Sequence, residues 1–222
     1  MRTVVFDLDG TLADTSGDLI NAANVCFRNL GLGDLLQHGQ DAATAVRGGR
    51  AMLTLGFERA GGIDPAEIDR QYPNLLAAYV EDLSTHTTFY DGALDAVREL
   101  REHGCKVAIC TNKPEALAVQ LMTELGALDL FDALIGADTL PVRKPDPAPY
   151  HAAVARAGGT VERSLMVGDT LTDQSTARAA GVPSVLVAFG PQGRKIADLQ
   201  PDALLHHYRD LTALVHELIK VD

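Results

Sequence analysis

The chain has 222 residues, which is enough for one large domain or for a core that carries a modest insertion. Hydrophobic residues make up 46% of it and charged residues 22%, close to the soluble globular average, so disordered and fibrous classes are excluded. The formal net charge of -11 would repel a phosphate backbone, and we expect no nucleic-acid partner. An anionic substrate would need a bound cation or a few placed basic residues to reverse the local charge.

Five short apolar segments have the composition of buried strands. They cover residues 3–6, 106–110, 133–135, 164–167 and 184–188. Most are continuous rather than alternating, which suits a parallel sheet that is covered on both faces. Helical segments that end at glycine lie between the later strands, over residues 93–103, 115–125, 147–157 and 173–180. This alternation predicts an α/β fold with a doubly wound parallel sheet.

A long insertion separates the first two predicted strands. About a hundred residues lie between them, far more than the thirty or so that a βαβ unit needs. The intervening chain has only helical patterns, such as those over residues 18–30 and 66–83. We therefore predict a core made of residues 1–14 and 90–222, interrupted by a small helical domain over residues 15–89. A helical spacing of apolar residues near the C-terminus predicts an amphipathic helix that docks on the core, with Leu211, Leu214, Val215, Leu218 and Ile219 facing it.

The cysteines and the N-terminal segment bear on where the protein works. Cys26, Cys105 and Cys110 follow no zinc-site or CxxC spacing, so we expect reduced and partly buried thiols. No apolar run approaches the about 18 residues of a membrane span, and Met1 leads into an apolar strand without a signal peptide. We therefore predict a cytoplasmic protein with no membrane partner.

Polar groups follow four of the predicted strands, at residues 7–11, 111–113, 143–146 and 168–173. Each segment alone has an ordinary explanation as a turn, a helix cap or a solvated charge. The carboxyl ends of parallel strands, however, meet at the edge of the sheet where ligands bind. Asp7, Asp9, Asp169 and Asp173 would repel one another there unless a proton or a metal neutralised them. Such oxygen ligands imply Mg²⁺, completed by water and substrate phosphate.

These segments carry a family resemblance. The DxDGT run over residues 7–11, Thr111 after an apolar strand, Lys144 before Pro-Asp-Pro and the GDxxxD run over residues 168–173 resemble the four motifs of the haloacid dehalogenase superfamily. The resemblance covers the core almost end to end and implies a Rossmann-like core with an inserted helical cap of the C1 type. Within the superfamily, one group of residues is similar to the phosphoglycolate phosphatase branch: Asp14, Thr15, Asp18, Leu19, Asn24 and Gly31.

The resemblance implies a role for each acidic residue. Asp7 would be the nucleophile that forms an aspartyl-phosphate, and Asp9 would be the general acid and base. Mg²⁺ would be held by the side chains of Asp7 and Asp169 and by the main-chain carbonyl of Asp9. Asp173 would act on the metal through water or by orienting a ligand. Lys144 would offset the charge of the nucleophile and of the transferring group.

Substrate binding is expected to involve both parts of the chain. Thr111 and the main-chain amide of Asn112 would hold phosphoryl oxygens, and Gly10 would permit the tight turn after the nucleophile. In the helical insertion, Arg47 and Arg50 flank two glycines and are the best candidates for substrate recognition. A solvated loop between helices explains those two arginines equally well.

The favoured hypothesis is a Mg²⁺-dependent phosphatase of small phosphorylated metabolites, with 2-phosphoglycolate as the leading substrate and a monomer or homodimer as the working form. Within the family, Asp9 favours phosphorus chemistry over dehalogenation. The absence of a histidine soon after Thr15 weakens a mutase assignment, and the absence of lysine from residues 14–89 weakens a phosphonatase assignment. Two alternatives stay open: a phosphatase of a sugar phosphate, nucleotide or pyrophosphate, and a catalytically idle binding module.

Overall fold

The computed structural model describes residues 1–62 and 65–220. The chain forms two compact units. Met1–Ala13 and Phe89–Asp222 make up the first, which we call the α/β unit, and Asp14–Thr88 make up the second, the helical unit. Over the described residues, every helix is too short or too polar to cross a bilayer.

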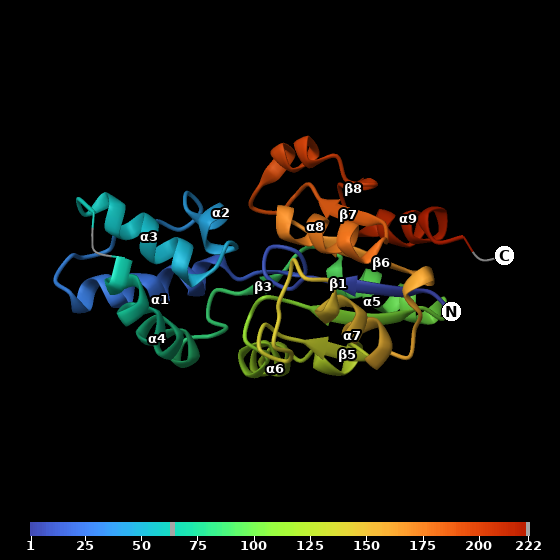
Figure 1. The fold of residues 1–222 in the computed structure, drawn as a ribbon, viewed down its shortest axis with the longest axis horizontal. Coiled ribbons are helices and arrows are strands. Elements are labelled where there is room, and N and C mark those ends of the chain that lie inside the picture. The colour runs from blue at the N-terminus through green and yellow to red at the C-terminus, as the bar shows by residue number, and fades with distance from the viewer. Residues whose placement is uncertain (63–64, 221–222) are drawn as a thin grey trace. The chain divides into compact units, whose positions relative to one another are not determined.

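A six-stranded sheet forms the centre of the α/β unit (Figure 1). Its order is β5-β4-β1-β6-β7-β8, and all neighbouring strands run parallel. The strands are Thr3–Phe6 (β1), Lys106–Cys110 (β4), Ala133–Ile135 (β5), Ser164–Gly168 (β6), Ser184–Val187 (β7) and Ala203–Leu205 (β8). From β1 in the middle, the chain adds β4 and β5 on one side and then β6, β7 and β8 on the other. The predicted doubly wound parallel sheet is therefore confirmed.

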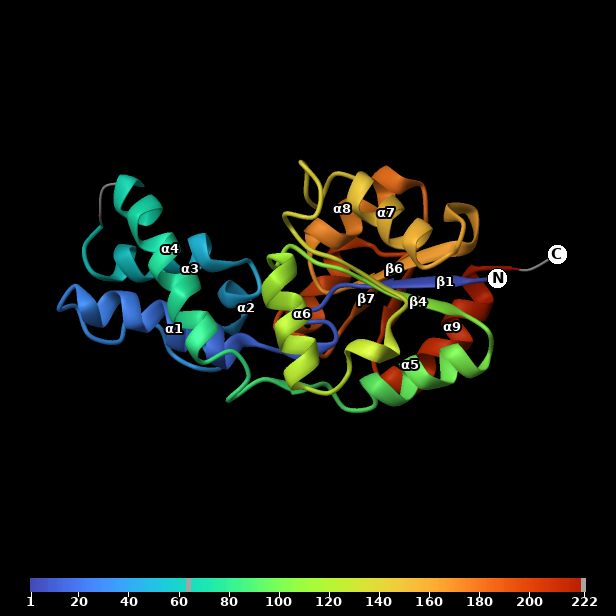
Figure 2. The same ribbon diagram turned by 90° about the horizontal axis from the view of Figure 1, so that it is seen from below.

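Helices cover both faces of this sheet (Figure 2). One face carries α7 (Ala148–Arg156) and α8 (Leu171–Ala180), and the other carries α5 (Ala93–Glu102) and α9 (Leu211–Leu218). Helix α6 (Glu115–Glu124) follows β4 and contacts β5. The short 3₁₀ helices are Leu128–Leu130 (η1), Val161–Arg163 (η2), Gly193–Leu199 (η3) and Tyr208–Asp210 (η4). Cover on both faces explains why the strand sequences are continuously apolar.

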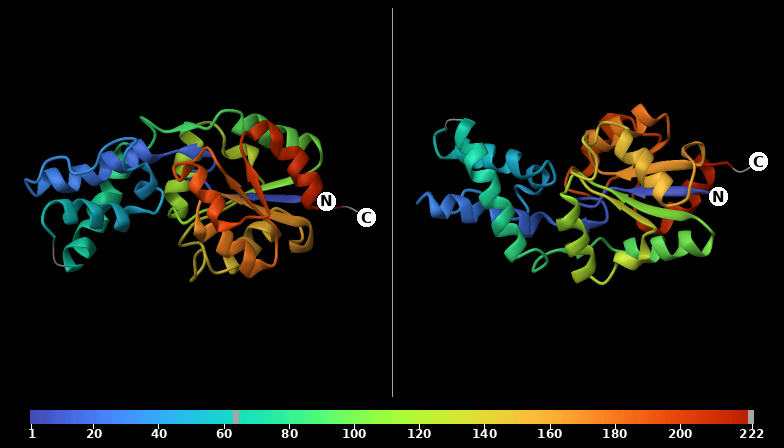
Figure 3. Two further views of the ribbon diagram at one scale, coloured as in Figure 1. Left: turned by 90° about the horizontal axis from the view of Figure 1, so that it is seen from above. Right: turned by 60° about the horizontal axis from the view of Figure 1, so that its bottom comes forward.

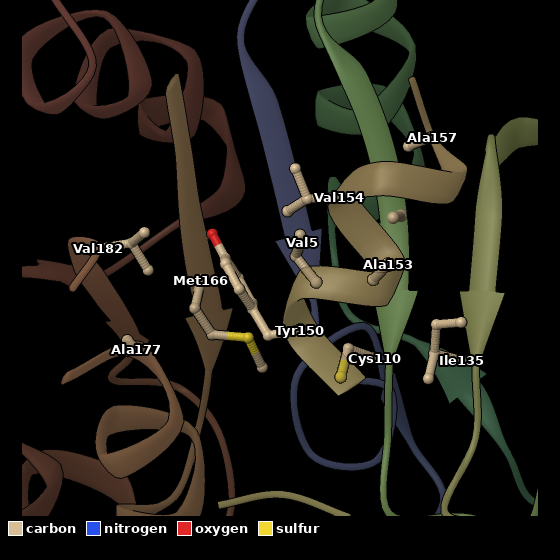
Figure 4. Packing of buried hydrophobic residues seen from close by; sticks show 11 residues of the cluster. Val5, Cys110, Ile135, Tyr150, Ala153, Val154, Ala157, Met166, Ala177 and Val182 are labelled. Atoms are coloured by element: carbon tan, nitrogen blue, oxygen red, sulfur yellow. The ribbon is translucent and has the colours of Figure 1, made fainter. Parts of the chain in front are cut away.

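One apolar cluster joins α7 to four strands of the sheet (Figure 4). Tyr150, Ala153 and Val154 of α7 pack over Val5 of β1 and Met166 of β6, and all five are buried. Burial of one such large side chain contributes about 1.5 to 3 kcal/mol. These contacts fix α7 against one face of the sheet, whose strands carry the polar segments at their carboxyl ends.

The C-terminal helix packs as its spacing predicts. Leu211, Val215 and Ile219 are buried, and α9 runs beside α5 (Figure 3). The guanidinium Nε of Arg2 donates a hydrogen bond of 2.8 Å to the carbonyl of Ile219, which joins this end of the chain to the start of β1.

The helical unit consists of α1 (Ser16–Asn29), α2 (Ala42–Ala45), α3 (Gly49–Arg59) and α4 (Pro65–Glu81). Helix α1 packs against the other three. The rings of Phe27 and Phe57 meet edge to face with centroids 5.2 Å apart. A Cβ at Gly56 would lie 2.1 Å from the Phe27 ring, so only glycine permits this contact.

The sequence patterns do not predict every element of the structure. Strand β8 and the short strands Ala13–Asp14 (β2) and Thr88–Phe89 (β3) were not predicted, because two or three residues carry too little periodicity. Helix α3 was hidden by its glycines. Helix α8 begins two residues before its predicted start, because Thr170 and Asp173 form a capping box.

Candidate active site

The winding of the sheet reverses at β1, so the carboxyl ends of β1, β4 and β6 form a topological switch point. Asp7, Thr111 and Asp169 are the first residues beyond these three strands. The amide of Asp7 donates to the carbonyl of Val167 at 2.9 Å, and the amide of Thr111 donates to that of Ile135 at 2.9 Å. The sheet ladder thus fixes the backbone at the point where the polar side chains begin.

A tight turn follows Asp7. The carboxylate of Asp7 accepts a 2.7 Å hydrogen bond from the amide of Leu8, and the carbonyl of Leu8 accepts from the amides of Leu12 and Ala13 at 3.0 and 3.1 Å. Gly10 has φ +81°, a left-handed conformation that favours glycine. The turn brings Asp7 and Asp9 to the same end of the sheet, and we call residues 7–13 the nucleophile turn after the role predicted for Asp7.

A buried lysine lies between two of the carboxylates. Lys144 Nζ is 2.6 Å from Asp173 Oδ1 and 3.0 Å from Asp7 Oδ1, and the lysine side chain is only 1% exposed. Burial alone would lower the pKa of Lys144, but the charges of Asp173 and Asp7 raise it overall. Lys144 is therefore a permanent cation next to the predicted nucleophile.

Asp7, Asp169 and Asp173 place carboxylate oxygens within 4.8 Å of one another. Burial, followed by the charge of Asp173, raises the pKa of Asp7 to about 7. Burial and the charges of Asp173 and Asp7 also raise the pKa of Asp169. The single positive charge of Lys144 therefore does not neutralise the negative charge of all three carboxylates.

Asp169 has an oxygen to offer a cation. Its Oδ1 accepts a 3.0 Å hydrogen bond from the hydroxyl of Thr11, whereas its Oδ2 is buried and meets no hydrogen-bond donor in the described parts of the chain. A buried carboxylate oxygen without a partner is costly in the absence of a cation. Because hard carboxylate oxygens are what Mg²⁺ prefers, the residues present fit the predicted ion.

Asp173 is already engaged on both oxygens. Lys144 occupies Oδ1, and Oδ2 accepts from the hydroxyl of Thr170 at 2.6 Å and from its amide at 3.1 Å. A Cβ at Gly168 would lie 2.3 Å from the Cβ of Asp173, so glycine is required at the end of β6. Asp173 therefore caps α8 and holds Lys144, while Asp7 and Asp169 remain the better metal ligands.

Lys113 is a second buried lysine at the site, and no role was predicted for it from the sequence. Its Nζ lies 2.8 Å from Asp9 Oδ1, with the lysine side chain 3% exposed. Its amide donates to the hydroxyl oxygen of Thr111 at 3.1 Å. The signal in the sequence is its place in the polar segment 111–113, directly after the strand that ends at Cys110.

The predicted phosphate-binding pair also lies at this edge. The Thr111 hydroxyl accepts from Lys113, which leaves its own proton available to an anion. The side-chain amide of Asn112 donates to the carbonyl of Lys144 at 3.0 Å and so ties two of the motif segments together. Of the predicted core residues, the structure brings together Asp7, Asp9, Gly10, Thr111, Asn112, Lys144, Asp169 and Asp173.

Arg47 and Arg50 lie in the helical unit, and the two differ. Arg50 belongs to the first turn of α3, where it forms an ion pair with Asp69 and stacks over the Tyr72 ring with its guanidinium carbon 4.8 Å from the ring centroid. Arg47 precedes Gly48, is exposed, and forms no ion pair with the residues that the structure describes. The expected loop is thus a short connection, and only Arg47 is uncommitted.

Comparison with known proteins identifies the family. Residues 4–187 match the family model described as haloacid dehalogenase-like hydrolase. The chain belongs to this family.

Curated relatives align with nearly the whole chain. A phosphoglycolate phosphatase of Mesorhizobium japonicum is 38% identical over 227 residues, covering 98% of this chain and 96% of the relative. A phosphoglycolate phosphatase of Caulobacter vibrioides is 36% identical over 211 residues, covering 94% and 88%. A crystal structure from Haemophilus somnus, described as a predicted phosphoglycolate phosphatase, shares the fold with a TM-score of 0.84 at 24% identity, covering 96% of this chain and 97% of that one. The family predicted from the four motifs is therefore confirmed.

Proposed function

We propose that this family member is a Mg²⁺-dependent phosphatase of small phosphomonoesters that works through an aspartyl-phosphate on Asp7. The observation that carries the proposal is the buried group of Asp7, Asp169 and Asp173, which has one lysine among its carboxylates and an unpartnered oxygen on Asp169. A hydrolase whose acidic residues are this crowded needs a cation before it can admit an anionic phosphate.

In the first step, a carboxylate oxygen of Asp7 attacks phosphorus while the ester bond to the leaving oxygen breaks. The leaving oxygen takes its proton from Asp9. Mg²⁺ would be held by Asp7, Asp169 and the main-chain carbonyl of Asp9, and it supplies the positive charge that lets two anions approach. In the second step, Asp9 takes a proton from water, the water oxygen bonds to phosphorus, and the bond to Asp7 breaks to release inorganic phosphate.

The remaining core residues hold the reacting groups. Lys144 keeps its charge beside Asp7 and offsets the negative charge that develops on the phosphoryl group. Thr111 donates its hydroxyl to a phosphoryl oxygen, with the main-chain amide of Asn112 as the second donor. Lys113 Nζ lies 2.8 Å from Asp9 Oδ1 and holds the Asp9 side chain in the orientation from which it exchanges its proton.

We propose 2-phosphoglycolate as the substrate, because the curated relatives at 36% and 38% identity are named for that activity. The substrate carries a carboxylate besides its phosphate, and we propose Arg47 for it, because Arg47 is exposed and has no ion pair among the described residues. Arg50 is less suited, since Asp69 and Tyr72 already engage it.

The test is a phosphometabolite panel measured by kcat/KM with Mg²⁺ and with a chelator. We expect 2-phosphoglycolate to rank first and all turnover to require the metal. Preference for a sugar phosphate, nucleotide or pyrophosphate would contradict the proposed substrate but not the proposed phosphatase mechanism. Absence of turnover on every ester, including a chromogenic one, would identify a catalytically idle binding module.

A further inference from the structure

Tyr208 lies far beyond the four motifs in the sequence, yet its hydroxyl reaches the nucleophile turn. Tyr208 opens the short helix η4 and is 1% exposed. Its Oη donates a buried 2.7 Å hydrogen bond to the main-chain carbonyl of Thr11. Thr11 is the residue whose own hydroxyl donates to Asp169 Oδ1 at 3.0 Å. Two hydrogen bonds thus lead from the tyrosine to the carboxylate proposed to hold Mg²⁺.

An aromatic group fixes the Tyr208 ring. Phe189 packs on it with centroids 5.2 Å apart and ring planes at 51°, and the Tyr90 ring packs on Phe189 with centroids also 5.2 Å apart. The preceding residue, His207, caps η4, because its Nδ1 accepts a 3.1 Å hydrogen bond from the amide of Arg209, and its Nε2 lies 3.1 Å from a carboxylate oxygen of Asp91. Burial, followed by the nearby charge of Asp169, raises the pKa of Tyr208 above its ordinary value, so the hydroxyl keeps the proton that it donates.

The segment after β7 adds a second contact to the same turn. A Cβ at Gly190 would lie 2.8 Å from the carbonyl oxygen of Gly10 and 3.4 Å from the Cβ of Asp169. The backbone after Phe189 therefore presses directly against the nucleophile turn and the metal ligand. A shift of the aromatic group would displace both, because a closely packed interior transmits small movements.

We propose that Tyr208 is a positioning residue for the cation site: it fixes Thr11, which holds one oxygen of Asp169 and leaves the other for Mg²⁺. This inference rests on the proposed metal-dependent function. Loss of the phenol hydroxyl leaves the Thr11 carbonyl buried without this donor. The backbone of residues 7–13 then becomes more mobile, and the Thr11 hydroxyl no longer holds the Asp169 carboxylate in a single orientation. Mg²⁺ binding must then order this carboxylate, which lowers the affinity for the ion.

Tyr208→Phe tests this, with Tyr150→Phe as the matched control. Tyr150 (Figure 4) is also fully buried, and its hydroxyl lies 2.6 Å from Ser164 Oγ. Ser164 begins β6, so this hydroxyl lies at the end of the strand opposite Asp169. Each variant loses one buried hydroxyl, so both lower the Tm of the metal-free protein. Calorimetric titration with Mg²⁺ alone should give a Kd raised about 3- to 10-fold by Tyr208→Phe, below the 10- to 100-fold typical of a direct partner of a metal ligand. Tyr150→Phe should leave the Kd unchanged.

A double-mutant cycle tests the route through Thr11. Thr11→Val removes the hydroxyl that holds Asp169 and should raise the Mg²⁺ Kd by about 10-fold or more. Addition of Tyr208→Phe should then change the Kd by less than twofold, because the two residues act in series. If Tyr208→Phe does not fold, His207→Ala is the substitute: it removes the side-chain cap of η4 and should raise the Mg²⁺ Kd about threefold.

The outcomes separate the two proposals. Wild-type protein that binds Mg²⁺ while Tyr208→Phe binds it equally well overturns the positioning role. Additive effects in the double-mutant cycle overturn the route through Thr11. Wild-type protein that neither binds Mg²⁺ nor hydrolyses phosphate esters overturns the proposed function instead.

Discussion

Two ion pairs, one in each unit, differ sharply in burial. In the α/β unit, Lys144 and Asp173 pair across 29 residues of sequence with exposures of 1% and 0%. In the helical unit, Arg50 and Asp69 pair with exposures of 55% and 68%. An exposed pair of that kind contributes about 0 to 1 kcal/mol to stability, so the Arg50 pair does little for the fold.

Burial alone does not distinguish the two units, because the helical unit also buries carboxylates. Asp41 receives two 2.7 Å hydrogen bonds from Arg59, and these lower its pKa. Burial and the charge of Asp173 instead raise the pKa of Asp7. A buried carboxylate that is fully paired stabilises a fold, whereas one that repels its neighbours indicates a site for a cation or a proton.

The largest effect expected is that of Asp7→Asn. The amide keeps the volume of the side chain but loses the nucleophile and a metal ligand, so turnover of every substrate should fall by about 10⁴-fold or more. Steady-state kinetics on 2-phosphoglycolate and on a chromogenic ester measure the loss. Asp41→Asn is the control from the helical unit and should lower Tm while kcat stays near that of wild type. Residual activity of Asp7→Asn above about 1% of wild type contradicts the covalent mechanism.

Asp9→Asn should cost somewhat less, by about 10² to 10⁴ in kcat, because it removes an acid and base but leaves the nucleophile. The loss should be greater for a poor leaving group, which needs the proton, than for a good one. A comparison of alkyl and nitrophenyl phosphates at saturating Mg²⁺ measures this difference. An unchanged kcat with both esters is incompatible with the role given to Asp9.

Arg47→Ala should change substrate choice and little else. We expect kcat/KM for 2-phosphoglycolate to fall about 10- to 100-fold, the scale of a charge-assisted hydrogen bond of ~1.5 to 3 kcal/mol. A phosphate ester without a carboxylate should be nearly unaffected. Arg50→Ala is the matched control, with an expected change below about threefold, since Arg50 is engaged by Asp69 and Tyr72. Equal losses on both esters would assign Arg47 a role unrelated to the carboxylate.

Asp18→Ala should weaken the helical unit without touching the chemistry. The buried Asp18 carboxylate accepts from the amides of His86 and Thr87 at 2.9 Å and from the Thr87 hydroxyl at 2.7 Å. These donors lose their partner in the variant, which should cost about 2 kcal/mol or more of unfolding free energy. Urea unfolding measures it. A midpoint equal to that of wild type would show that water replaces the carboxylate without cost.

The pH dependence of stability should differ between the units. Asp7 has a pKa of about 7 in the fold against 3.8 as its ordinary value, so the folded chain binds a proton between these values that the unfolded chain lacks. The Tm of chelator-treated protein should therefore fall as the pH rises from about 4 to about 7. Asp41, whose pKa is lowered in the fold, loses its contribution only as the pH falls below about 3.8. The raised pKa of Asp169 contributes in the same direction, so Asp7→Asn should make the fall smaller without abolishing it. A fall as large as that of wild type would remove Asp7 as a cause.

Local patterns in the sequence determined the fold class and most of the core site. Continuous apolar strands of four or five residues and glycine-terminated helices specify a covered parallel sheet. The hydrophobic periodicity and the helix-end signals that identify these elements depend only on residues close together in the sequence. The position of Asp7, Thr111 and Asp169 directly after such strands then predicts that they meet. The family resemblance rested on those same segments and is confirmed by the match over residues 4–187.

Only the tertiary structure decided which of these groups are already paired. Lys113 meets Asp9 across 104 residues, Thr11 meets Asp169 across 158, and Tyr208 meets Thr11 across 197. Arg47 and Arg50 have similar sequence surroundings, since each lies next to a glycine. Their environments differ because Tyr72 and Asp69 lie beside Arg50. No local period encodes such contacts. They depend on how far-apart segments pack, and packing decides which buried oxygen is left without a partner.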